Sequence, residues 1–248
     1  MYFPFIFGGS PLIMLGFLAA LLLGIWATIM VRSAYAKYSR VPMRAGLTGA
    51  EVARYILDQA GSEDWAIDAA ARGAPTTRDV RIEMVPGMLA DHYDPINRVL
   101  RLSPEVYQGT SLAAAGVAAH EAGHAIQHAK GFAPLHLRTT LYPLANIGSQ
   151  AWPFLMIAGF MFGLRNLGWL LDVGIILFSF AVAFYLITLP VEFDASRRAL
   201  AYLGGYGLLS DRELVGARKV LRAAALTYVA AALTAVIQLL YLLSLRRD

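Results

Sequence analysis

The chain has 248 residues, of which 58% are hydrophobic and only 15% are charged, with a formal net charge of +4. Soluble domains carry roughly 25% charged residues, so this composition excludes an ordinary soluble globular protein. There is no cysteine, which excludes disulfide bonds and thiolate metal sites.

The first predicted element is a transmembrane helix over residues 4–31, a run without any ionisable side chain. A helix needs about 20 apolar residues to cross the hydrocarbon core of a bilayer, and this run is longer. It is too long for the apolar part of a cleaved signal peptide, and no basic segment precedes it. We therefore expect it to remain in the chain as a membrane anchor.

Residues 32–138 have the composition of a water-soluble region and predict a small α+β fold. Residues 47–61 predict a helix with Thr48 as its N-cap, Glu51 in its first turns and Gly61 at its end. This helix is the first element of the expected soluble region.

Two strands are expected after this helix. The sequences DVRIEMV (79–85) and RVLRLS (98–103) alternate apolar and polar residues, as half-buried strands do. The segment between them is rich in turn-forming residues and predicts a loop. SPEVYQG then predicts a short helical turn, and residues 111–130 predict a second helix that ends at Gly131.

The second helix carries HEAGH, which fits the H-E-x-x-H pattern of zinc peptidases. His120 and His124 are one turn apart, so both rings can direct a nitrogen at one ion about 2.0–2.1 Å away. Glu121 lies on the adjacent face, where it can act as general base on the metal-bound water. The alternative is an Ala-rich core helix, but a glutamate beside two histidines on such a helix needs partners.

A third histidine, His128, follows at the same spacing. On an unbroken helix His120 and His128 are about 12 Å apart, so the three rings cannot converge on one ion. Metalloproteases that take a third histidine from downstream first break the helix with a glycine, whereas Gly131 comes after His128. We expect His128 to flank the site without binding the metal, and His136 remains an alternative ligand.

Three further apolar runs predict transmembrane helices over 139–164, 168–191 and 223–245. Two prolines and two amide side chains interrupt the first of these runs. A buried or interfacial helix is therefore the alternative for residues 139–164.

The distribution of Lys and Arg predicts the orientation. Of 21 such residues, twelve lie in 32–138 and six in 192–222, whereas only Arg165 lies in the turn between the second and third spans. The positive-inside rule places 32–138 and 192–222 in the cytoplasm and both termini outside, with Arg246 and Arg247 as exceptions. Topology thus explains the basic charge, and we expect no nucleic-acid partner.

Glu192 is the expected third metal ligand. A catalytic zinc takes three protein ligands and keeps one open position, and two histidines with one glutamate are a known set. An acid at the end of an apolar helix is costly unless it has a positive partner, and this topology places Glu192 on the side of the two histidines. The alternatives are an ion pair with Arg197 or Arg198, and Asp194 as the ligand instead.

Several stretches resemble the YugP-like neutral zinc metallopeptidases of bacterial membranes. The resemblance covers residues 33–225, agrees with four spans, and is carried by GLTGAEVAR, DHYDP, LRLSPEVY, AAHEAGHAIQHA, APLHLR, NIGSQ and LPVEFDASRRA. It implies a zinc protease of the bacterial plasma membrane.

A more distant similarity is to the HtpX-like and CAAX prenyl proteases. They carry a downstream Glu-x-x-x-Asp motif whose Glu binds zinc and whose Asp supports a zinc-binding histidine. Glu192 fits the ligand position, but Ser196 stands at the position of the Asp. The supporting role therefore falls either to the Ser196 hydroxyl or to Asp194.

We predict a mainly α, polytopic membrane protein with about four transmembrane helices and a small cytoplasmic α+β, zincin-like catalytic region. The predicted activity is that of a membrane-embedded, gluzincin-like metalloendopeptidase with Zn²⁺ on His120, His124 and Glu192 and with Glu121 as base. A membrane scaffold or adaptor with a structural zinc is the alternative. A transporter with Glu192 and Asp172 as intramembrane acids is disfavoured, because the four spans show no inverted repeat.

The expected partners are a membrane-associated protein or peptide substrate and the lipid bilayer, while a homo-oligomer or a membrane regulatory partner stays open. We expect a substrate strand to pair with RVLRLS as an edge strand. His92, Arg197, Arg198 and Tyr202 are equal candidates for the donor that stabilises the oxyanion.

Overall fold

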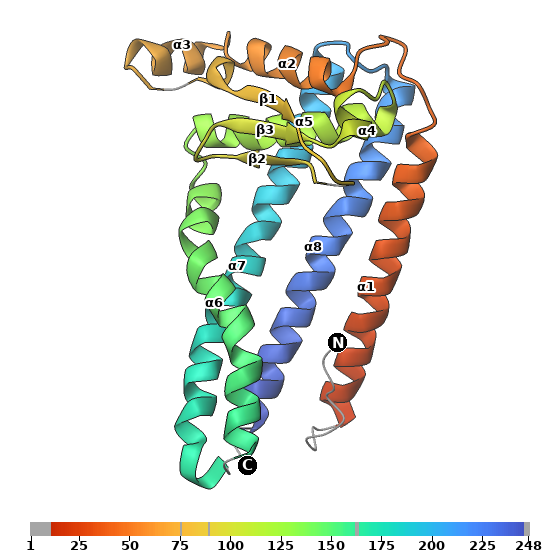
Figure 1. Cartoon of the computed structure of the whole chain (residues 1–248). Helices are drawn as coiled ribbons and strands as arrows, with labels where there is room; N and C mark the ends of the chain where they lie inside the picture. Colours follow the sequence, from red (N-terminus) through yellow and green to blue (C-terminus); the bar gives the residue numbers. More distant parts are fainter. Residues whose placement is uncertain (1–10, 75, 89, 162–163, 246–248) are drawn as a thin grey trace. The chain divides into compact units, whose positions relative to one another are not determined.

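The computed structural model describes residues 11–74, 76–88, 90–161 and 164–245, which form a mainly helical chain with one small sheet (Figure 1). Contacts divide the chain into two compact units. Unit 1 contains the described residues of 1–28, 137–190 and 226–248, and unit 2 contains Ile29–His136 and Val191–Ala225.

Unit 1 is built from parts of four long helices, whose full bounds are α1 (Pro11–Tyr38), α6 (Ala133–Met161), α7 (Leu164–Gly205) and α8 (Asp211–Leu245). Among the described residues, three stretches are long and apolar enough to cross a membrane: Met14–Tyr38, Trp169–Gly205 and Asp211–Ser244. The predicted span 139–164 corresponds largely to α6, which is not among these three, and residues 162–163 lie outside the described part. Four spans therefore remain a prediction.

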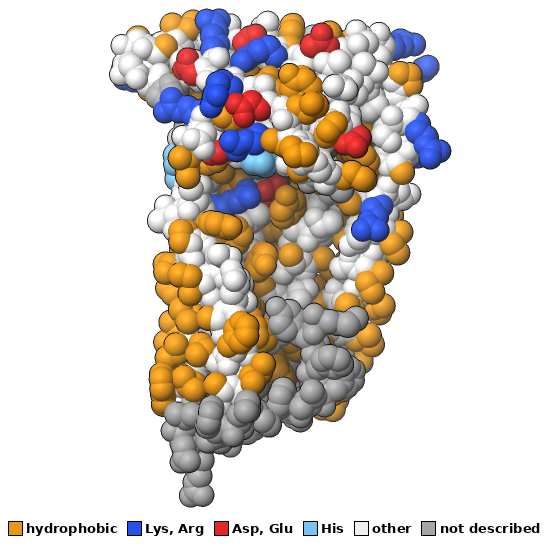
Figure 2. Space-filling view, viewed as in Figure 1, with side chains coloured by type: hydrophobic (Ala, Val, Ile, Leu, Met, Phe, Trp, Pro, Cys, Tyr) orange, Lys and Arg blue, Asp and Glu red, His pale blue; other side chains and the backbone are white. Residues whose placement is uncertain are grey.

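The helices of unit 1 pack through small and aromatic residues. A Cβ atom added at Gly148 of α6 would lie 2.1 Å from the carbonyl oxygen of Leu177 on α7, so only glycine permits this approach. Nearby, the rings of Trp152 and Phe178 lie 5.4 Å apart. Close packing at small residues is typical of helices in membranes. Hydrophobic side chains cover most of the visible surface of these helices (Figure 2).

Unit 2 holds the sheet and the shorter helices (Figure 1). In chain order these elements are α2 (Gly49–Ala60), α3 (Asp64–Ala71), the 3₁₀ turn η2 (Thr77–Asp79), β1 (Arg81–Met84), β2 (His92–Asp94), β3 (Val99–Leu102), α4 (Pro104–Tyr107) and α5 (Leu112–Ala129). Lys, Arg, Asp and Glu side chains are frequent on the visible surface over the sheet and α2 (Figure 2). The helix α3 was not expected from the sequence.

Local signals set the helix ends of unit 2. Thr48 and Glu51 form the reciprocal hydrogen bonds of a capping box at the start of α2. The Ser111 hydroxyl accepts the backbone N–H of Ala114 at the start of α5. After α5, Gly131 adopts a φ of 66°, a left-handed conformation that glycine takes without a steric penalty. The predicted starts and ends of these two helices are confirmed to within about two residues.

The sheet order is β1-β3-β2, with β1 parallel and β2 antiparallel to β3. The strand in RVLRLS is therefore central, and the prediction that it is an edge strand is wrong. Its outer partner β2 lies inside the segment predicted as a loop. β2 has only three residues, and Asp94 at its end accepts the backbone N–H groups of Ile96 and Asn97 in the turn to β3. So short a strand is recognisable only by its pairing.

The core of unit 2 forms where α2, α5, α7 and the sheet meet. Its members are apolar and almost entirely buried, and include Val52, Ile56, Leu57, Leu100, Leu102, Ala118, Ala122, Ile126, Ala199 and Leu203. The helix α5 contributes mostly alanines on this side, so neighbouring backbones can approach it closely. This packing holds α5 and the end of α7 together at the position where the predicted metal ligands lie.

Candidate metal centre

The helix α5 places His120 and His124 one turn apart, and their rings lie with centroids 4.8 Å apart. Glu192 comes from α7, 72 positions after His120. Gly123 allows the two helices to meet: a Cβ there would lie 2.8 Å from the carbonyl oxygen of Ala195, closer than real Cβ atoms come. The glycine of HEAGH is thus the contact that brings α7, and with it Glu192, against the histidine face.

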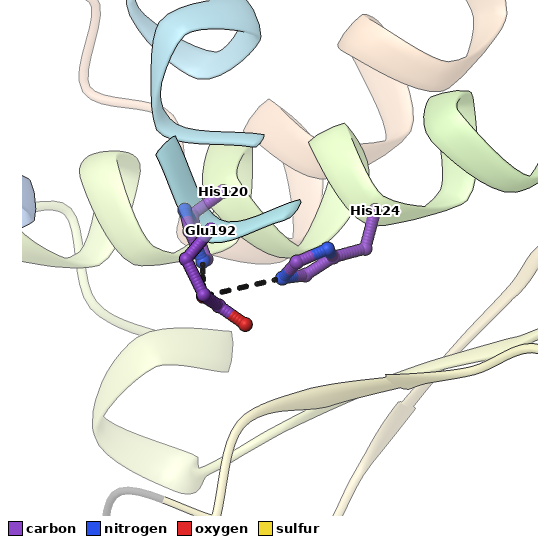
Figure 3. A group of neighbouring side chains, drawn as sticks. All are labelled: His120, His124 and Glu192. Carbon is purple, nitrogen blue, oxygen red and sulfur yellow. Dashed lines mark hydrogen bonds and ion pairs between the residues drawn. The ribbon is translucent and has the colours of Figure 1, made fainter. Parts of the chain in front are cut away.

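Three potential ligand atoms converge at this contact (Figure 3). Glu192 Oε2 lies 3.1 Å from His120 Nε2 and 3.7 Å from His124 Nε2. One ligand atom from each of the three residues lies within 4.8 Å of the others. The three side chains predicted as metal ligands are therefore neighbours in the folded chain.

The other ring nitrogen of each histidine has a partner of its own. His120 Nδ1 lies 3.1 Å from the hydroxyl oxygen of Ser196. His124 Nδ1 lies 3.0 Å from the side-chain oxygen of Gln127. Histidines that bind metals usually donate the second N–H to such an outer partner, which fixes the ring orientation and leaves the remaining lone pair for the metal.

This donor set fits zinc. Zinc commonly binds imidazole nitrogens and carboxylate oxygens, and this group offers two of the first and one of the second. Three protein ligands leave the fourth coordination position of zinc open. The Nε2 atoms of His120 and His124 face one Glu192 carboxylate, while their Nδ1 atoms are held by Ser196 and Gln127. The site is largely closed to solvent, with only 3% of the Glu192 side chain exposed.

Glu121 lies next to His120 on α5 and is buried. Burial raises the pKa of the Glu121 carboxyl to about 7, because a charged carboxylate is poorly solvated there. The nearby Glu192 carboxylate raises this pKa further, whereas His120 lowers it. A carboxyl whose pKa lies near neutrality can both take up and release a proton in a catalytic cycle.

The alternative ligands lie outside this group. The Nδ1 atom of His128 is 2.9 Å from the hydroxyl of Tyr93, which is on β2, and its ring is tilted against that of His136 with centroids 5.7 Å apart. Asp194 forms ion pairs with Arg197 and Arg198. Asp194 is thus no member of the His120, His124 and Glu192 group.

All four candidates for the oxyanion donor have partners of their own. Arg197 and Arg198 pair with Asp194, and the Tyr202 hydroxyl donates to Glu63 at 2.6 Å. His92 stands at the start of β2, and its ring Nδ1 lies 2.7 Å from the carbonyl oxygen of Ala90. Its Nε2 lies 3.5 Å from Nη1 of Arg101.

Gln127 was not singled out from the sequence. It lies three positions after His124 and is completely buried on α5. The signal that could have identified it is a large polar residue on the face of an otherwise small and apolar helix, because a buried amide must find hydrogen-bond partners. Its role could not be read from spacing, because the partners of its side-chain nitrogen lie on α7.

The fold and the site together describe a helical chain with membrane-length segments and a histidine–glutamate group that could hold a metal ion. Over residues 13–247 the chain matches the family described as "Putative neutral zinc metallopeptidase". This chain therefore belongs to that zinc metallopeptidase family.

Among individual proteins, the chain is similar to the "Putative membrane protease YugP" of Bacillus subtilis (strain 168). The two are 47% identical over 223 residues, which is 90% of this chain and 91% of that protein. No solved structure matches the chain.

Proposed function

We propose that this protein is a membrane-embedded zinc endopeptidase of the gluzincin type, with His120, His124 and Glu192 as metal ligands. The observation that carries the proposal is the convergence of their three ligand atoms within 4.8 Å, from helices far apart in the sequence. The outer partners on both histidines agree with it, because they hold each Nδ1 and leave each Nε2 facing Glu192. The family and the YugP relative support the same class of activity.

Bound to these three ligands, zinc supplies a Lewis acid for the scissile carbonyl and a water molecule of lowered pKa. Glu121 takes the proton of the attacking water and later passes it to the leaving amine. Its burial suits this role, because it raises the pKa of the Glu121 carboxyl to about 7. A general base works best when its pKa lies near the working pH. His120 and His124 are held in place by Ser196 and Gln127.

The substrate backbone pairs with β2 in this proposal, since β2 is an edge strand of the sheet and β3 is not. β2 packs against α5 and contacts it through Tyr93, whose hydroxyl meets His128 one turn beyond His124. His92, at the start of the same strand, is the proposed donor to the oxyanion: as an imidazolium it would donate through Nε2, in place of that atom's 3.5 Å contact with Arg101, while Nδ1 keeps the Ala90 carbonyl. A His92→Ala variant that cleaves at the wild-type rate would contradict this assignment.

The proposed membrane arrangement has four spans, with residues 139–164 as the second. Eighteen of the 21 Lys and Arg residues lie in 32–138 and 192–222, so we place these segments on the cytoplasmic side and both termini outside. The site would thus face the cytoplasm from the bacterial plasma membrane. Membrane-associated proteins or peptides are the proposed substrates.

The test compares the purified wild-type protein with Glu121→Gln. The substitution keeps the shape and removes the proton acceptor, so zinc content should stay near one ion per chain. Cleavage of an unfolded protein substrate in detergent should fall by roughly 10²–10⁴-fold, as for loss of a general base. Glu105→Gln is the matched control, because Glu105 is an exposed acid on α4.

A scaffold or adaptor with a structural zinc has no cleavage activity to lose. If wild-type protein with full zinc content cleaves no substrate, that alternative replaces the proposal. If Glu121→Gln keeps its zinc and cleaves at nearly the wild-type rate, Glu121 is not the base.

A further inference from the structure

Gln127 is a buried polar residue whose side-chain nitrogen bonds to α7 and whose side-chain oxygen meets His124 on its own helix, α5. Its side-chain nitrogen donates to the carbonyl oxygen of Val191 at 2.8 Å and to Asp194 Oδ2 at 2.9 Å. Its side-chain oxygen lies 3.0 Å from His124 Nδ1. An amide nitrogen has two protons, so both are committed, and the oxygen that faces His124 can only accept.

The orientation of this amide is set by its surroundings. Asp194 is 6% exposed and pairs with Arg197 and Arg198, so it is an ionised carboxylate that can only accept hydrogen bonds. If the Gln127 amide were turned over, its oxygen would face both this carboxylate and the Val191 carbonyl oxygen. Two oxygen–oxygen contacts would replace two hydrogen bonds in a buried place, which is strongly unfavourable.

The consequence reaches His124. Because the Gln127 oxygen must accept, His124 Nδ1 must carry the proton. In a neutral ring the lone pair then lies on Nε2, the nitrogen that faces Glu192 at 3.7 Å. The amide thus presents the histidine in the one neutral form whose free nitrogen points toward the metal ligands.

We propose that Gln127 is a positioning residue that fixes the tautomer of His124, and that the Asp194 carboxylate orients the Gln127 amide for this task. The proposal rests on the proposed function only in assigning His124 to the metal. The tautomer itself is a property of the metal-free protein and does not depend on peptidase activity. Val191 directly precedes Glu192, so the same amide also ties His124 to the helical turn that carries the third ligand.

The tautomer can be measured in the full-length, metal-free protein in detergent, with ¹⁵N-labelled histidine at a pH where the rings are neutral. The chain has only five histidines, so single His variants assign the signals. We expect the proton of wild-type His124 on Nδ1 and an unprotonated Nε2. A proton on Nε2 in the wild-type protein would overturn the proposal without any variant.

Two variants test the cause. Gln127→Met keeps the length of the side chain and removes the amide, while Asp194→Asn lets residue 194 donate and thereby releases the constraint on the amide. Both should give a mixture of His124 tautomers and should raise the zinc dissociation constant by about 10–100-fold, the range for loss of an outer partner. Gln108→Met, at an exposed glutamine, is the control and should change neither quantity.

If either folded variant keeps a single Nδ1-protonated tautomer and binds zinc as tightly as the wild type, the proposal is wrong. The two proposals fail in different ways. A protein with the expected tautomer and zinc affinity but no peptidase activity contradicts the proposed function alone. An active peptidase with an unchanged tautomer in both variants contradicts the role of Gln127 alone.

Discussion

The hydroxyl oxygen of Ser196 lies 3.1 Å from Nδ1 of His120, while Nε2 of the same ring faces Glu192. Ser196 stands where the more distant proteases carry an aspartate that supports a zinc-binding histidine. The hydroxyl makes that contact here. Asp194, the other candidate for this role, reaches the second histidine only through Gln127. Ser196 on α7 thus supports His120, whereas Gln127 near the end of α5 supports His124.

The Ser196 contact predicts a weaker metal site in Ser196→Ala. Loss of an outer partner typically lowers metal affinity by about 10–100-fold, and we expect a change in this range, while Ser196→Thr should keep most of the affinity. Competition with a chelator gives the zinc dissociation constant in detergent. Ser39→Ala, which changes an exposed serine of unit 2, is the control. Equal affinities for Ser196→Ala and wild type would mean that the hydroxyl does not support the ring.

Gly123 predicts a steric effect on the site. In Gly123→Ala the new methyl group meets the backbone of Ala195 at 2.8 Å, so α7 must move away from α5 and carry Glu192 with it. We expect zinc affinity to fall at least about tenfold, even though alanine favours a helix by about 1 kcal/mol over glycine.

Gly116→Ala on the same helix is the matched control for this steric effect. Its methyl group would meet Ala217 at 3.5 Å, an ordinary contact. Zinc affinity should therefore stay at the wild-type level in this variant. Equal losses in both variants would show that the close contact at Gly123 does not position Glu192.

The ligand assignment predicts which substitutions remove the metal. His120→Ala, His124→Ala and Glu192→Ala should each lose most of the zinc on purification, because each removes one of only three protein ligands. His128→Ala should retain it, since the His128 ring contacts Tyr93 instead of Glu192. Metal analysis of the purified variants decides the matter. Zinc lost from His128→Ala but kept by Glu192→Ala would require a different ligand set.

Glu63 predicts a pH-dependent contribution to stability. It accepts hydrogen bonds from Trp65 Nε1 at 2.5 Å and Tyr202 at 2.6 Å and pairs with Lys130 at 3.3 Å. Burial opposes its ionisation, but the hydrogen bonds from Tyr202 and Trp65 and the charge of Lys130 lower the pKa of this carboxyl overall. The pKa of Glu63 is lower in the folded than in the unfolded chain. Its ionised carboxylate therefore stabilises the fold fully above the unfolded-state pKa of about 4.3, and this stabilisation is lost as the pH falls through the folded-state pKa.

We therefore expect Glu63→Gln to lower the thermal midpoint at pH 7 and to differ less from the wild type as the pH falls below about 4.3. Thermal unfolding in detergent between neutral and acidic pH measures this difference. Glu105→Gln, at an exposed acid, should follow the wild type throughout. A difference between Glu63→Gln and wild type that stays constant over this pH range would rule out the ionised carboxylate as its source.

The proposed topology predicts the accessibility of single cysteines, which the cysteine-free chain makes simple to interpret. Met88→Cys and Gly205→Cys should react with a membrane-impermeant reagent only from the cytoplasmic side. Met88 is 75% exposed, and an added side chain at Gly205 meets open space. Asn166→Cys should react only from outside. Labelling of positions 88 and 205 from opposite sides would separate Glu192 from the histidines by a bilayer and end the three-ligand proposal.

Features that depend on neighbours in the sequence were predicted well. The Thr48 N-cap with Glu51 in the first turn, the end of α5 before Gly131 and the shared face of His120 and His124 all involve residues within four positions of each other. Helix geometry alone decides such relationships. The exclusion of His128 from the ligands rested on the same geometry and agrees with its contact to Tyr93.

Features that depend on distant partners were predicted less well. A strand acquires its place in a sheet from its pairing partners, so β2 was expected to be a loop and β3 an edge. Arg197 and Arg198 were weighed as partners of Glu192, but both bind Asp194, because on a helix residues three and four positions apart are neighbours. The expected topology and the usual ligand set of zinc pointed to Glu192, and the resemblance supported it, but no local rule could show that it would reach the histidines.

The sequence by itself determined the class of this protein: its apolar runs, its two-histidine helix and its lack of cysteine restrict it to a membrane chain with a non-thiolate metal site. These properties follow from composition and from the period of the α-helix. The tertiary structure alone decided how the site is completed. It brings Glu192 to the histidines across the close contact at Gly123. It also buries Gln127, so that the side-chain oxygen of this residue accepts a hydrogen bond from His124. Such contacts depend on which backbones can approach each other and which polar groups lose water together, and neither is set by residues adjacent in the chain.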